Sequence, residues 1–498
     1  MTRITPSRLL SLSRAARLVG ITRGALQKRI RQGDLQSFEG DVSLDELANL
    51  FPDIQMEDNT MLEKMDQFIE TALQRARYKK LSELTLPDSE TLIARVRSLS
   101  REIIALQHSA QVYQDAFEHL RQQIQSIDPD LTGTALTALA ALQRRLHDRP
   151  VGLKQPASKE QLFTTDTLLR LMMAQVRIQP SGEEFYIEGE TSILESALSA
   201  GLPIDYGCSS GNCGKCKAKL IAGEIRQTRP HDYVLTTEDK NNHIFLGCCH
   251  TATTDIIIET EIAGQSSDIP QQTITAQVKR LEVINEHMQR LKLRTPRTQR
   301  LRFLAGQTAR VKLSEGGENT LTIASCPCDD MNIEFHIPVD KDQAFFQQLQ
   351  KLKNNDKIEL NGPNGDFILD FHDTRPLVMI AIDDQFAATK SLIEHAMTLE
   401  SAEFIHLYWL ISAPKYHYLD NVCRSWADAF EQFQYNVIAF DDHKPASLAS
   451  AITGITTQHP ASEDALYYID VGPDSRDTVM AALAAAGLES ERLHINNA

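Results

Sequence analysis

The sequence predicts a multidomain α/β protein whose N-terminal part is helical. With 498 residues the chain is too long for one hydrophobic core, so three to five domains are expected. Apolar residues follow helical spacing up to about residue 150, and from about residue 174 strand-like runs alternate with helical ones to the end of the chain. The composition also changes four times along the chain, which indicates several domain boundaries.

Charge and hydropathy restrict the location and the partners of the chain. The formal net charge is −16, and residues 151–498 carry all of the acidic excess, so this part is not expected to bind nucleic acid. Residues 1–33 are the opposite, with eight basic side chains and no acidic one. No apolar run approaches the roughly 18 residues of a membrane span, and the Arg-rich start lacks the apolar stretch of a signal peptide, which predicts a cytoplasmic protein. Eight cysteines, most of them clustered, favour metal binding over disulfides in such a chain.

Residues 1–52 are expected to form a small basic domain. The stretch "LSRAARLVGITRGALQKRIRQGDL" predicts a helix, a tight turn at Gly20 and a second helix. It resembles the winged helix-turn-helix of the MerR and excisionase class, which implies that the second helix enters the major groove of DNA. The DNA contacts are then expected from Arg23, Gln27, Lys28 and Arg31. The alternative is a helix-turn-helix used for protein contacts.

Residues 53–150 are expected to be helical. Apolar positions at alternating four- and three-residue spacing predict a coiled coil over residues 88–128 that joins two chains in a homodimer. These positions are Leu92, Val96, Leu99, Ile103, Leu106, Ala110, Tyr113, Phe117, Leu120, Ile124 and Ile127. Packing of this seam against neighbouring helices of the same chain is the alternative. Residues 151–173, which include "RPVGLKQPASKE", are typical of a linker.

The stretch "GCSSGNCGKC" places three cysteines among glycines and small polar residues. Cys208, Cys213 and Cys216 have C-x4-C-x2-C spacing, and Cys248 follows far along the chain. This layout of four thiolates is typical of plant-type [2Fe–2S] sites. A zinc site or a set of free thiols is the alternative, but four-cysteine zinc sites usually pair two C-x2-C knuckles, which this sequence lacks.

The sequence around these cysteines resembles a plant-type ferredoxin domain over residues 174–266. The resemblance rests on "TSILESALSAGLPIDYGCSSGNCGKCKAKLIAGEI" and "FLGCCHTATTDIIIE". It implies a β-grasp fold and a [2Fe–2S] cluster held by Cys208, Cys213, Cys216 and Cys248, with Cys249 beside the fourth ligand. The remaining cysteines are expected to be ordinary buried or surface thiols, namely Cys326, Cys328 and Cys423.

Residues 272–498 contain five further motifs in a defined order. They are "FLAGQTARVKL", "TLTIASCP", "NGPNGDFIL", "RPLVMIAI" and "YYIDVGP". In this order and at these intervals they resemble the ferredoxin reductase family. The resemblance implies a flavin-binding β-barrel over residues 272–372 and a Rossmann-like, NAD(P)-binding α/β domain over residues 373–498.

The positions that would hold flavin depart from the family pattern. The family has an R-x-Y-S/T motif, and the matching residues are Asn319, Leu321 and Thr322, so only the hydroxyl is kept. A second phosphate-binding element of the family is rich in glycine, whereas the corresponding "VDKDQAFFQQL" has none. These changes predict a degenerate site and make bound FAD doubtful.

The nucleotide positions depart in the same way. The family turn G-G-x-G presents backbone N–H groups to a pyrophosphate, but the chain reads "AIDDQFAATKS", with Asp383 and Asp384 where the phosphates would lie. Repulsion from two carboxylates would weaken binding. Val471 replaces the family cysteine beside the nicotinamide. NAD(P) is therefore also doubtful, and the alternative is a divergent reductase that binds its cofactors through other residues.

Three functions are consistent with these motifs. We favour a dimeric, DNA-binding, redox-responsive regulator that senses or relays electrons through a [2Fe–2S] cluster and keeps a degenerate reductase module. The second is an electron-transfer oxidoreductase of the ferredoxin reductase type that uses flavin, NAD(P)H and a redox partner protein, and this is the expected class if the chain is an enzyme. The third is a non-catalytic assembly protein.

Overall fold

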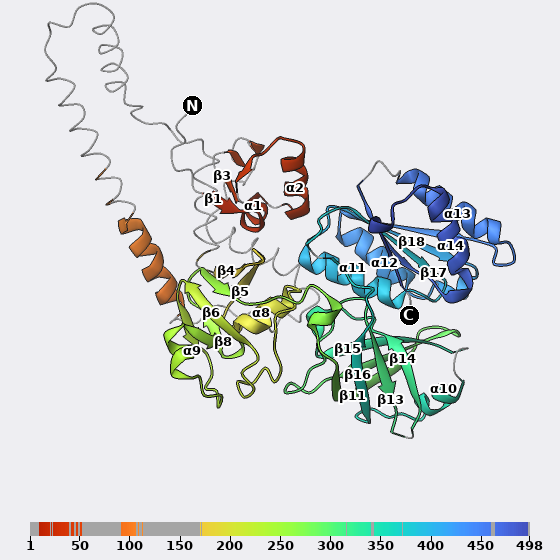
Figure 1. The fold of residues 1–498 in the computed structure, drawn as a ribbon, viewed down its shortest axis with the longest axis horizontal. Helices are drawn as coiled ribbons and strands as arrows, with labels where there is room; N and C mark the ends of the chain where they lie inside the picture. Colours follow the sequence, from red (N-terminus) through yellow and green to blue (C-terminus); the bar gives the residue numbers. More distant parts are fainter. Residues whose placement is uncertain are drawn as a thin grey trace, which may run out of the picture.

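The computed structural model describes three parts of the chain (Figure 1). They are most of residues 9–51, residues 91–105 with residues 108 and 112, and residues 170–496 apart from short gaps at 171, 315, 340–342, 371 and 460–463. Most of the predicted coiled coil and of the linker lies outside the described residues. None of the helices in the described parts is long and apolar enough to span a membrane.

Residues 9–51 form a small unit of two helices and three short strands. Its sheet has the antiparallel order β1-β3-β2. The bounds are β1 Leu9–Ser11, α1 Leu12–Val19, α2 Arg23–Arg31, β2 Ser37–Phe38 and β3 Asp41–Ser43. Ala15, Ala16, Leu18 and Leu26 are buried in its core, and Met173 from the following unit packs into the same core. The unit is thus attached to the rest of the protein by apolar contact.

Residues 91–105 form a helix whose predicted seam is partly exposed. Val96 and Ile103 are 50% and 53% exposed, whereas Thr91 and Arg95 are buried. The other two described seam positions, Leu92 and Leu99, are partly buried.

Residues 173–259 form the unit that carries the four predicted ligands, here called the cluster unit. Its five-stranded sheet has the order β5-β4-β10-β6-β8, with β4 and β10 parallel and the other pairs antiparallel. The bounds are β4 Met173–Gln179, β5 Glu184–Glu188, α8 Ile193–Ser199, β6 Lys217–Ala222, β7 Ile225–Gln227, α9 Thr237–Asn241, β8 Ile244–Leu246, β9 His250–Ala252 and β10 Ile256–Glu259. Alternate residues of β4 are buried, as a strand with one face on a core requires. Ser192 starts α8 by accepting the N–H of Glu195.

Residues 272–364 form an antiparallel barrel-like sheet of six strands in the order β14-β13-β16-β11-β12-β15. The bounds are β11 Gln272–Val283, β12 Met288–Arg294, β13 Thr308–Lys312, β14 Glu318–Thr322, β15 Asn332–Pro338, α10 Gln343–Leu349 and β16 Lys357–Asn364. A bridge between Ile323 and Phe335 joins the two end strands. Alternate apolar residues of each strand fill the interior, which confirms the predicted barrel.

Residues 377–495 form a parallel sheet covered by helices on both faces, which confirms the predicted α/β unit. The strand order is β19-β18-β17-β20-β21. The bounds are β17 Leu377–Ile382, α11 Ala387–Leu399, β18 Ile405–Ile411, α12 Asp420–Ala429, β19 Phe433–Ala439, α13 Pro445–Gln458, β20 Leu466–Asp470, α14 Pro473–Ala485 and β21 Leu493–Ile495. Helices α11 and α12 pack on one face and α13 and α14 on the other, so every residue of β17 is buried.

Candidate functional site

The loop between α8 and β6 turns its backbone toward the sulfur of Cys208. Cys208 Sγ accepts N–H groups from Ser210, Asn212 and Cys213 at 3.5, 3.3 and 3.3 Å. Cys213 Sγ in turn accepts the N–H of Cys208 at 3.3 Å. Donors that converge on sulfur are what a loop that holds thiolates needs, because they stabilise negative charge on the ligands.

Cys216 and Cys248 lie on the buried side of the same site. Cys248 belongs to the short turn η3 (Gly247–Cys249), and its thiol interacts with that of Cys216. Arg229 donates from Nε to the carbonyl oxygen of Cys248 at 2.9 Å, which holds the turn in place. Gly211 has φ 84°, and a Cβ there would lie 2.8 Å from Cys249 Sγ, so only glycine fits this crossing of the two loops.

The surroundings give the neighbouring thiols of Cys248 and Cys249 different proton affinities. The hydrogen bond with Cys216 is the main cause that lowers the pKa of Cys248 to about 6. Burial raises the pKa of Cys249 to about 12. At Cys208 burial acts against ionisation, but the loop's hydrogen bonds outweigh it and lower the pKa to about 6. The contact of the Cys248 thiol with that of Cys216 is compatible with Cys248 as the fourth ligand.

The donor set fits a binuclear cluster. Among the described residues, no three or more Cys, His, Asp or Glu side chains are arranged to hold a single metal ion. Cys208 interacts with Cys213, and Cys216 interacts with Cys248, whose Sγ also lies 3.5 Å from Cys249 Sγ. A [2Fe–2S] cluster takes two thiolates on each iron, which the two assigned pairs can supply. The hydroxyl of Ser209 in the same loop is buried and, within the described parts, has no hydrogen-bond partner, so it is free to donate to a bound cluster.

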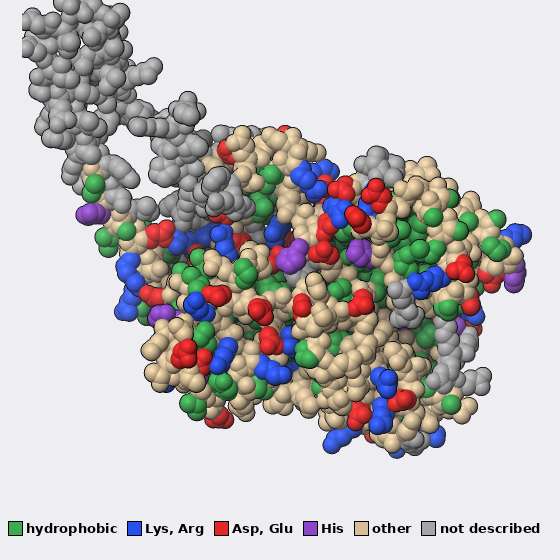
Figure 2. All heavy atoms as spheres, viewed as in Figure 1, with side chains coloured by type: hydrophobic (Ala, Val, Ile, Leu, Met, Phe, Trp, Pro, Cys, Tyr) green, Lys and Arg blue, Asp and Glu red, His purple; other side chains and the backbone are tan. Residues whose placement is uncertain are grey.

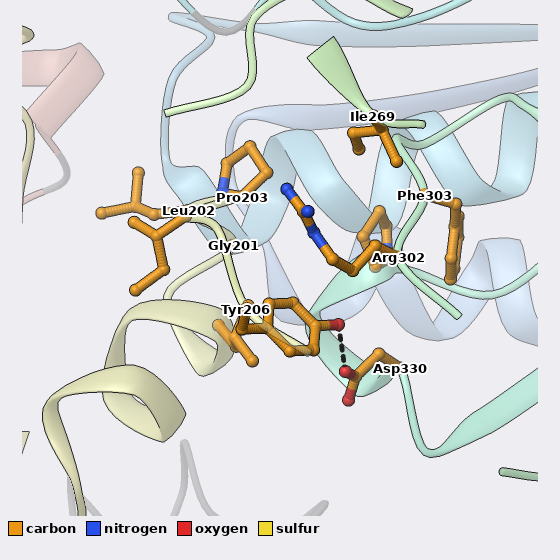
Figure 3. A pocket seen from close by; sticks show the side chains of 11 residues that line it. Gly201, Leu202, Pro203, Tyr206, Ile269, Arg302, Phe303 and Asp330 are labelled. Atoms are coloured by element: carbon orange, nitrogen blue, oxygen red, sulfur yellow. Dashed lines mark hydrogen bonds between the residues drawn. The ribbon is translucent and has the colours of Figure 1, made fainter. Parts of the chain in front are cut away.

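A buried ionic joint ties the cluster unit to the barrel. Arg300 is 5% exposed and donates from Nη2 to Glu195 Oε1 at 2.6 Å and from Nη1 to Asp330 Oδ1 at 3.1 Å. Tyr206, two residues before Cys208, donates its hydroxyl to Asp330 (Figure 3). Burial raises the pKa of Asp330 to about 6, against the opposing charge of Arg300. The joint therefore fixes both α8 and the cysteine loop on the barrel.

A small cleft lies beside this joint (Figure 3). Its lining includes Leu202, Pro203, Ile269, Arg302 and Phe303, which come from the cluster unit, the connection and the barrel. Arg302 pairs with Asp205 and lies 5.5 Å from the ring centre of Tyr206. The cleft thus follows the seam between the two units.

Three basic residues of α2 pair with carboxylates of other units. Arg23 Nη1 lies 3.4 Å from Glu183 Oε2 in the cluster unit. Lys28 Nζ lies 3.5 Å from Glu403 Oε1 in the α/β unit, and Arg31 pairs with the same carboxylate. Figure 2 shows basic and acidic side chains side by side at this junction. Arg23, Lys28 and Arg31, which were assigned to DNA, therefore each have an acidic partner within the chain, and Lys28 and Arg31 share theirs.

Two other residues of α2 also argue against DNA binding by this helix. Gln27, expected to read a base edge, has its Oε1 buried without a hydrogen-bond partner in the described parts. A Cβ on Gly24 would lie 2.9 Å from the carbonyl oxygen of Ala402. Part of the helix face assigned to DNA thus lies against the α/β unit.

The three positions that depart from the flavin motif lie on β14, at the end of the sheet. Asn319 and Thr322 are partly exposed, whereas Leu321 belongs to the barrel core. Among the described strands, β14 pairs along its length only with β13, and its other side makes the single bridge at Ile323. Contacts through the backbone of such an edge do not require a particular side chain. The missing Arg and Tyr therefore do not exclude a flavin from this edge.

The α/β unit has the topology of a nucleotide-binding crevice. Strand order reverses beside β17, with β18 on one side and β20 on the other, and ligands of such sheets bind at the carboxyl ends of the strands next to the reversal. The turn at Gln385 after β17 meets Gly472 after β20, where a Cβ would lie 3.9 Å from Gln385 Cγ. Thr389, in the first turn of α11, has a buried hydroxyl that lacks a hydrogen-bond partner within the described parts.

The two carboxylates after β17 are engaged by neighbouring residues. Asp383 Oδ1 accepts the N–H and the hydroxyl of Ser412 at 2.7 and 2.9 Å. Asp384 Oδ1 accepts Nε2 of Gln385 at 2.8 Å. Burial raises the pKa of Asp383. Val471 is buried beside this turn. Both carboxylates therefore have hydrogen-bond donors within the chain.

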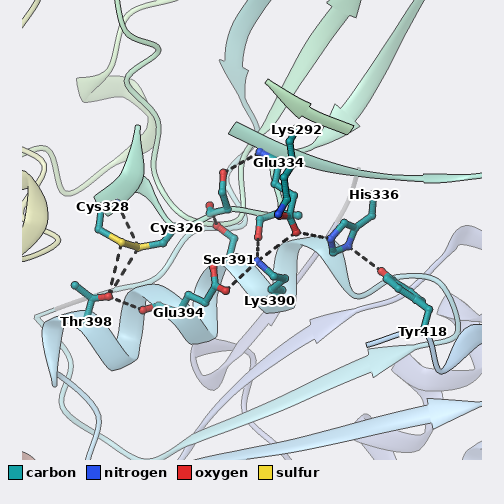
Figure 4. Close-up of polar contacts among 12 residues, drawn as sticks. Lys292, Cys326, Cys328, Glu334, His336, Lys390, Ser391, Glu394, Thr398 and Tyr418 are labelled. Atoms are coloured by element: carbon teal, nitrogen blue, oxygen red, sulfur yellow. Dashed lines mark hydrogen bonds and ion pairs between the residues drawn. A yellow bond between two sulfur atoms is a disulfide. The ribbon is translucent and has the colours of Figure 1, made fainter. Parts of the chain in front are cut away.

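A buried polar chain between the barrel and α11 was missed by sequence reasoning (Figure 4). Lys390 Nζ lies 2.9 Å from Glu394 Oε1 and 3.5 Å from Glu334 Oε1. His336 connects Glu334, at 2.9 Å, with the hydroxyl of Tyr418, at 3.0 Å. Burial opposes ionisation of Glu334, but His336 and Lys390 hold its pKa below the ordinary range. The only sequence signal is the alternation of Glu and His with apolar residues in "NIEFHIP".

Two family models match the chain. The model of the 2Fe-2S iron-sulfur cluster binding domain matches residues 176–253, and that of the oxidoreductase FAD-binding domain matches residues 275–368. The chain is therefore a protein of the class that combines an iron–sulfur domain with a flavin-binding reductase domain.

Relatives define the family further. The CDP-6-deoxy-L-threo-D-glycero-4-hexulose-3-dehydrase reductase of Yersinia pestis is 31% identical over 273 residues, which cover 54% of this chain and 82% of the relative. Reductase component 1 of terephthalate 1,2-dioxygenase from a Comamonas species is 27% identical over 264 residues, covering 53% and 78%. The solved structure of the Amycolatopsis cytochrome P450 reductase GcoB matches with a TM-score of 0.41 and 20% identity, covering 65% of this chain and 98% of that one. The chain belongs to the family of iron–sulfur flavoprotein reductases that includes the Yersinia enzyme.

These matches correct two expectations. The DNA-binding regulator is wrong, because the relatives are reductase components and α2 is closed by Glu183 and Glu403. The doubt about FAD and NAD(P) is also wrong, because residues 275–368 match the FAD-binding domain as a whole and the relatives are reductases. The doubt rested on departures at single motifs of the flavin and nucleotide sites, whereas the match to the FAD-binding domain extends over residues 275–368.

Proposed function

We propose that the chain is the reductase component of an electron-transfer system that uses NAD(P)H, FAD and a [2Fe–2S] cluster. When bound, these groups convert a two-electron hydride into single electrons that leave through the cluster. The observation that supports this most strongly is the joint at Arg300, because it holds a cluster-binding unit directly against a flavin-binding barrel. The pair between Arg302 and Asp205 supports the same docking.

We assign the cluster to Cys208, Cys213, Cys216 and Cys248. Convergent N–H groups of the loop would stabilise the thiolates, and Ser209 would donate to the cluster. Cys249 would stay a protonated neighbour, since burial raises its pKa.

The other two cofactors have matching places in the fold. The edge of β14, with the partly exposed Thr322 hydroxyl, would hold the flavin ring through backbone groups. The crevice between Gln385 and Gly472 would hold the nucleotide, with the unpartnered Thr389 hydroxyl available in the first turn of α11. The engaged Asp383 and Asp384 would border this crevice without repelling a phosphate strongly.

The electron acceptor would be a separate enzyme. The relatives are named as reductases of a dehydrase and of a dioxygenase. We infer that this chain serves an acceptor of the same kind, which needs single electrons at a bound cofactor. We also propose that two copies associate along the helix of residues 91–105, since Val96 and Ile103 expose apolar surface there.

One preparation tests the cofactor set and the direction of electron flow. Anaerobically purified protein is expected to release about one flavin per chain on heating and to show a [2Fe–2S] absorbance spectrum. NADH or NADPH should then drive the reduction of ferricyanide and of cytochrome c. Cys248→Ser should keep ferricyanide reduction and lose most cytochrome c reduction, because the second acceptor takes electrons from the cluster. Protein that binds no flavin under these conditions would refute the proposal.

A further inference from the structure

Cys326 and Cys328 form a disulfide at the place where the barrel meets the α/β unit and the cluster unit (Figure 4). Their Cα atoms are 5.2 Å apart, within the usual range for a disulfide. The other six cysteines of the chain are free thiols in the structure. The expectation that these two are ordinary thiols is therefore wrong, because the turn at Pro327 brings their sulfurs together.

The two sulfurs have different surroundings. Cys326 is 5% exposed, and its Sγ accepts the N–H of Cys328 at 3.3 Å. Cys328 is partly exposed. Thr398 Oγ1 on α11 lies 3.8 Å from Cys328 Sγ and 4.0 Å from Cys326 Sγ. An external thiol can therefore approach Cys328, while the N–H bond would stabilise Cys326 as the departing thiolate.

We propose that Cys326 and Cys328 form a thiol–disulfide exchange site whose substrates are low-molecular-weight thiols of the glutathione class. An external thiolate attacks Cys328 Sγ, the bond between the two protein sulfurs breaks, and Cys326 leaves as a thiolate. A second external thiolate then attacks the mixed disulfide, which releases the oxidised small molecule and the Cys328 thiolate. The disulfide gains two electrons in total, the two external thiols lose two, and both protein thiolates take up protons from water.

The position of this pair connects its redox state to the joint described above. Asp330, two residues after Cys328, holds Tyr206 and Arg300. The turn η5 (Pro327–Asp329) packs against both α8 and α11. Opening the disulfide releases a constraint within this segment, so reduction should loosen the docking of the cluster unit. This consequence rests on the proposed function, whereas the exchange reaction does not.

Tryptic mapping tests the exchange directly. Residues 313–341 form one tryptic peptide that contains Cys326 and Cys328 and no other cysteine. Native holoprotein is equilibrated with set ratios of reduced and oxidised glutathione, quenched with acid, denatured and labelled with a maleimide. The peptide should change from no label to two labels as the reduced fraction rises. The peptide of residues 416–424, with the buried Cys423, should carry one label throughout and serves as the control.

Single variants test which sulfur is attacked. Cys326→Ser leaves the partly exposed Cys328, which should form a mixed disulfide with oxidised glutathione. Cys328→Ser leaves the buried Cys326, which should form at least tenfold less. Two labels on the wild-type peptide in fully oxidised glutathione, or none in excess reduced glutathione, would overturn the proposal, and equal glutathionylation of the two variants would overturn the assigned order. None of these readouts requires flavin or NAD(P)H, so a failure of the proposed function would be seen separately.

Discussion

Tyr206 donates its hydroxyl to the carboxylate of Asp330, and this contact joins the cysteine loop to the barrel. Asp330 also accepts Arg300 at 3.1 Å, so one carboxylate serves both units. Because Tyr206 lies two residues before Cys208, the position of the first cluster ligand is linked through a few bonds to a buried group of the barrel.

Tyr206→Phe is expected to slow electron transfer from the flavin to the cluster without affecting flavin reduction. The variant keeps the ring but leaves Asp330 without one donor, which should lower the free energy of unfolding by about 1–3 kcal/mol. NADH-driven cytochrome c reduction should fall several-fold while ferricyanide reduction is unchanged. Tyr416→Phe, outside the joint, is the matched control. Equal slowing of both reactions would contradict the role given to the joint.

Serine variants of the four assigned ligands should lose most of the cluster. A hydroxyl is a poorer ligand for iron than a thiolate, so Cys208→Ser, Cys213→Ser, Cys216→Ser and Cys248→Ser should lower iron content and the electron spin resonance signal of the reduced protein. Cys249→Ser is the neighbouring control and should keep both. Loss of iron with Cys249→Ser but not with Cys248→Ser would show that Cys249 is the fourth ligand and that Cys248 is not.

Asp470 should make stability depend on pH. It is 2% exposed and accepts Asn496 Nδ2 at 2.8 Å, and burial raises its pKa to about 7. The folded protein then binds this proton more tightly than the unfolded chain, so the contribution to stability falls as pH rises from about 4 to about 7. Asp470→Asn should remove this fall. Between about pH 4 and pH 7 the free energy of unfolding of the variant should therefore rise relative to that of the wild type by about 1–4 kcal/mol. Urea unfolding of both proteins across that range measures it, and parallel curves would refute it.

Gly24→Ala should loosen α2 from the α/β unit. The added methyl group would lie 2.9 Å from a backbone oxygen, which cannot move as a side chain can, and such overpacking costs about 1–3 kcal/mol. Hydrogen exchange of the amides in α2 should become faster, although alanine favours the helix itself. Gln32→Ala, at an exposed position just after α2, is the control. Unchanged exchange in Gly24→Ala would show that the contact is not maintained in solution.

Aspartate at both exposed seam positions should reduce the mass of the particle. Val96→Asp with Ile103→Asp places charge at two a/d positions of the predicted coiled coil, which should separate two chains if they associate there. Light scattering should then report a smaller species than for the wild type. Ile104→Asp, also exposed but outside the seam, is the control. A wild-type mass that already corresponds to one chain would end the dimer hypothesis.

Local motifs were sufficient to predict the cluster loop and the order of the folds. The spacing of Cys208, Cys213 and Cys216 reports chemistry within one short loop, and buried strands such as β17 are visible as apolar runs. The assignment of α2 to DNA failed for the opposite reason. The spacing shows that α2 has a basic face. The acidic partners of that face, Glu183 and Glu403, lie far along the chain and come close to α2 only through tertiary packing.

The flavin and disulfide predictions failed because they considered side chains one motif at a time. Asn319 and Leu321 lack the family's side chains, but the edge of β14 also offers backbone groups, which a motif does not record. Cys326 and Cys328 were treated as separate thiols because their spacing matches no metal site. The spacing alone does not show that the turn at Pro327 brings their sulfurs together.

The contacts between the four units form a closed ring. The N-terminal unit touches the cluster unit at Glu183 and the α/β unit at Glu403, the cluster unit touches the barrel at Asp330, and the barrel touches α11 through a hydrogen bond from Ser391 to a barrel carbonyl. Because the four units form a closed ring of contacts, movement of one unit relative to its neighbour must be matched by movement at another contact. The N-terminal unit therefore links the cluster unit to the α/β unit on the side away from the barrel contact at Asp330.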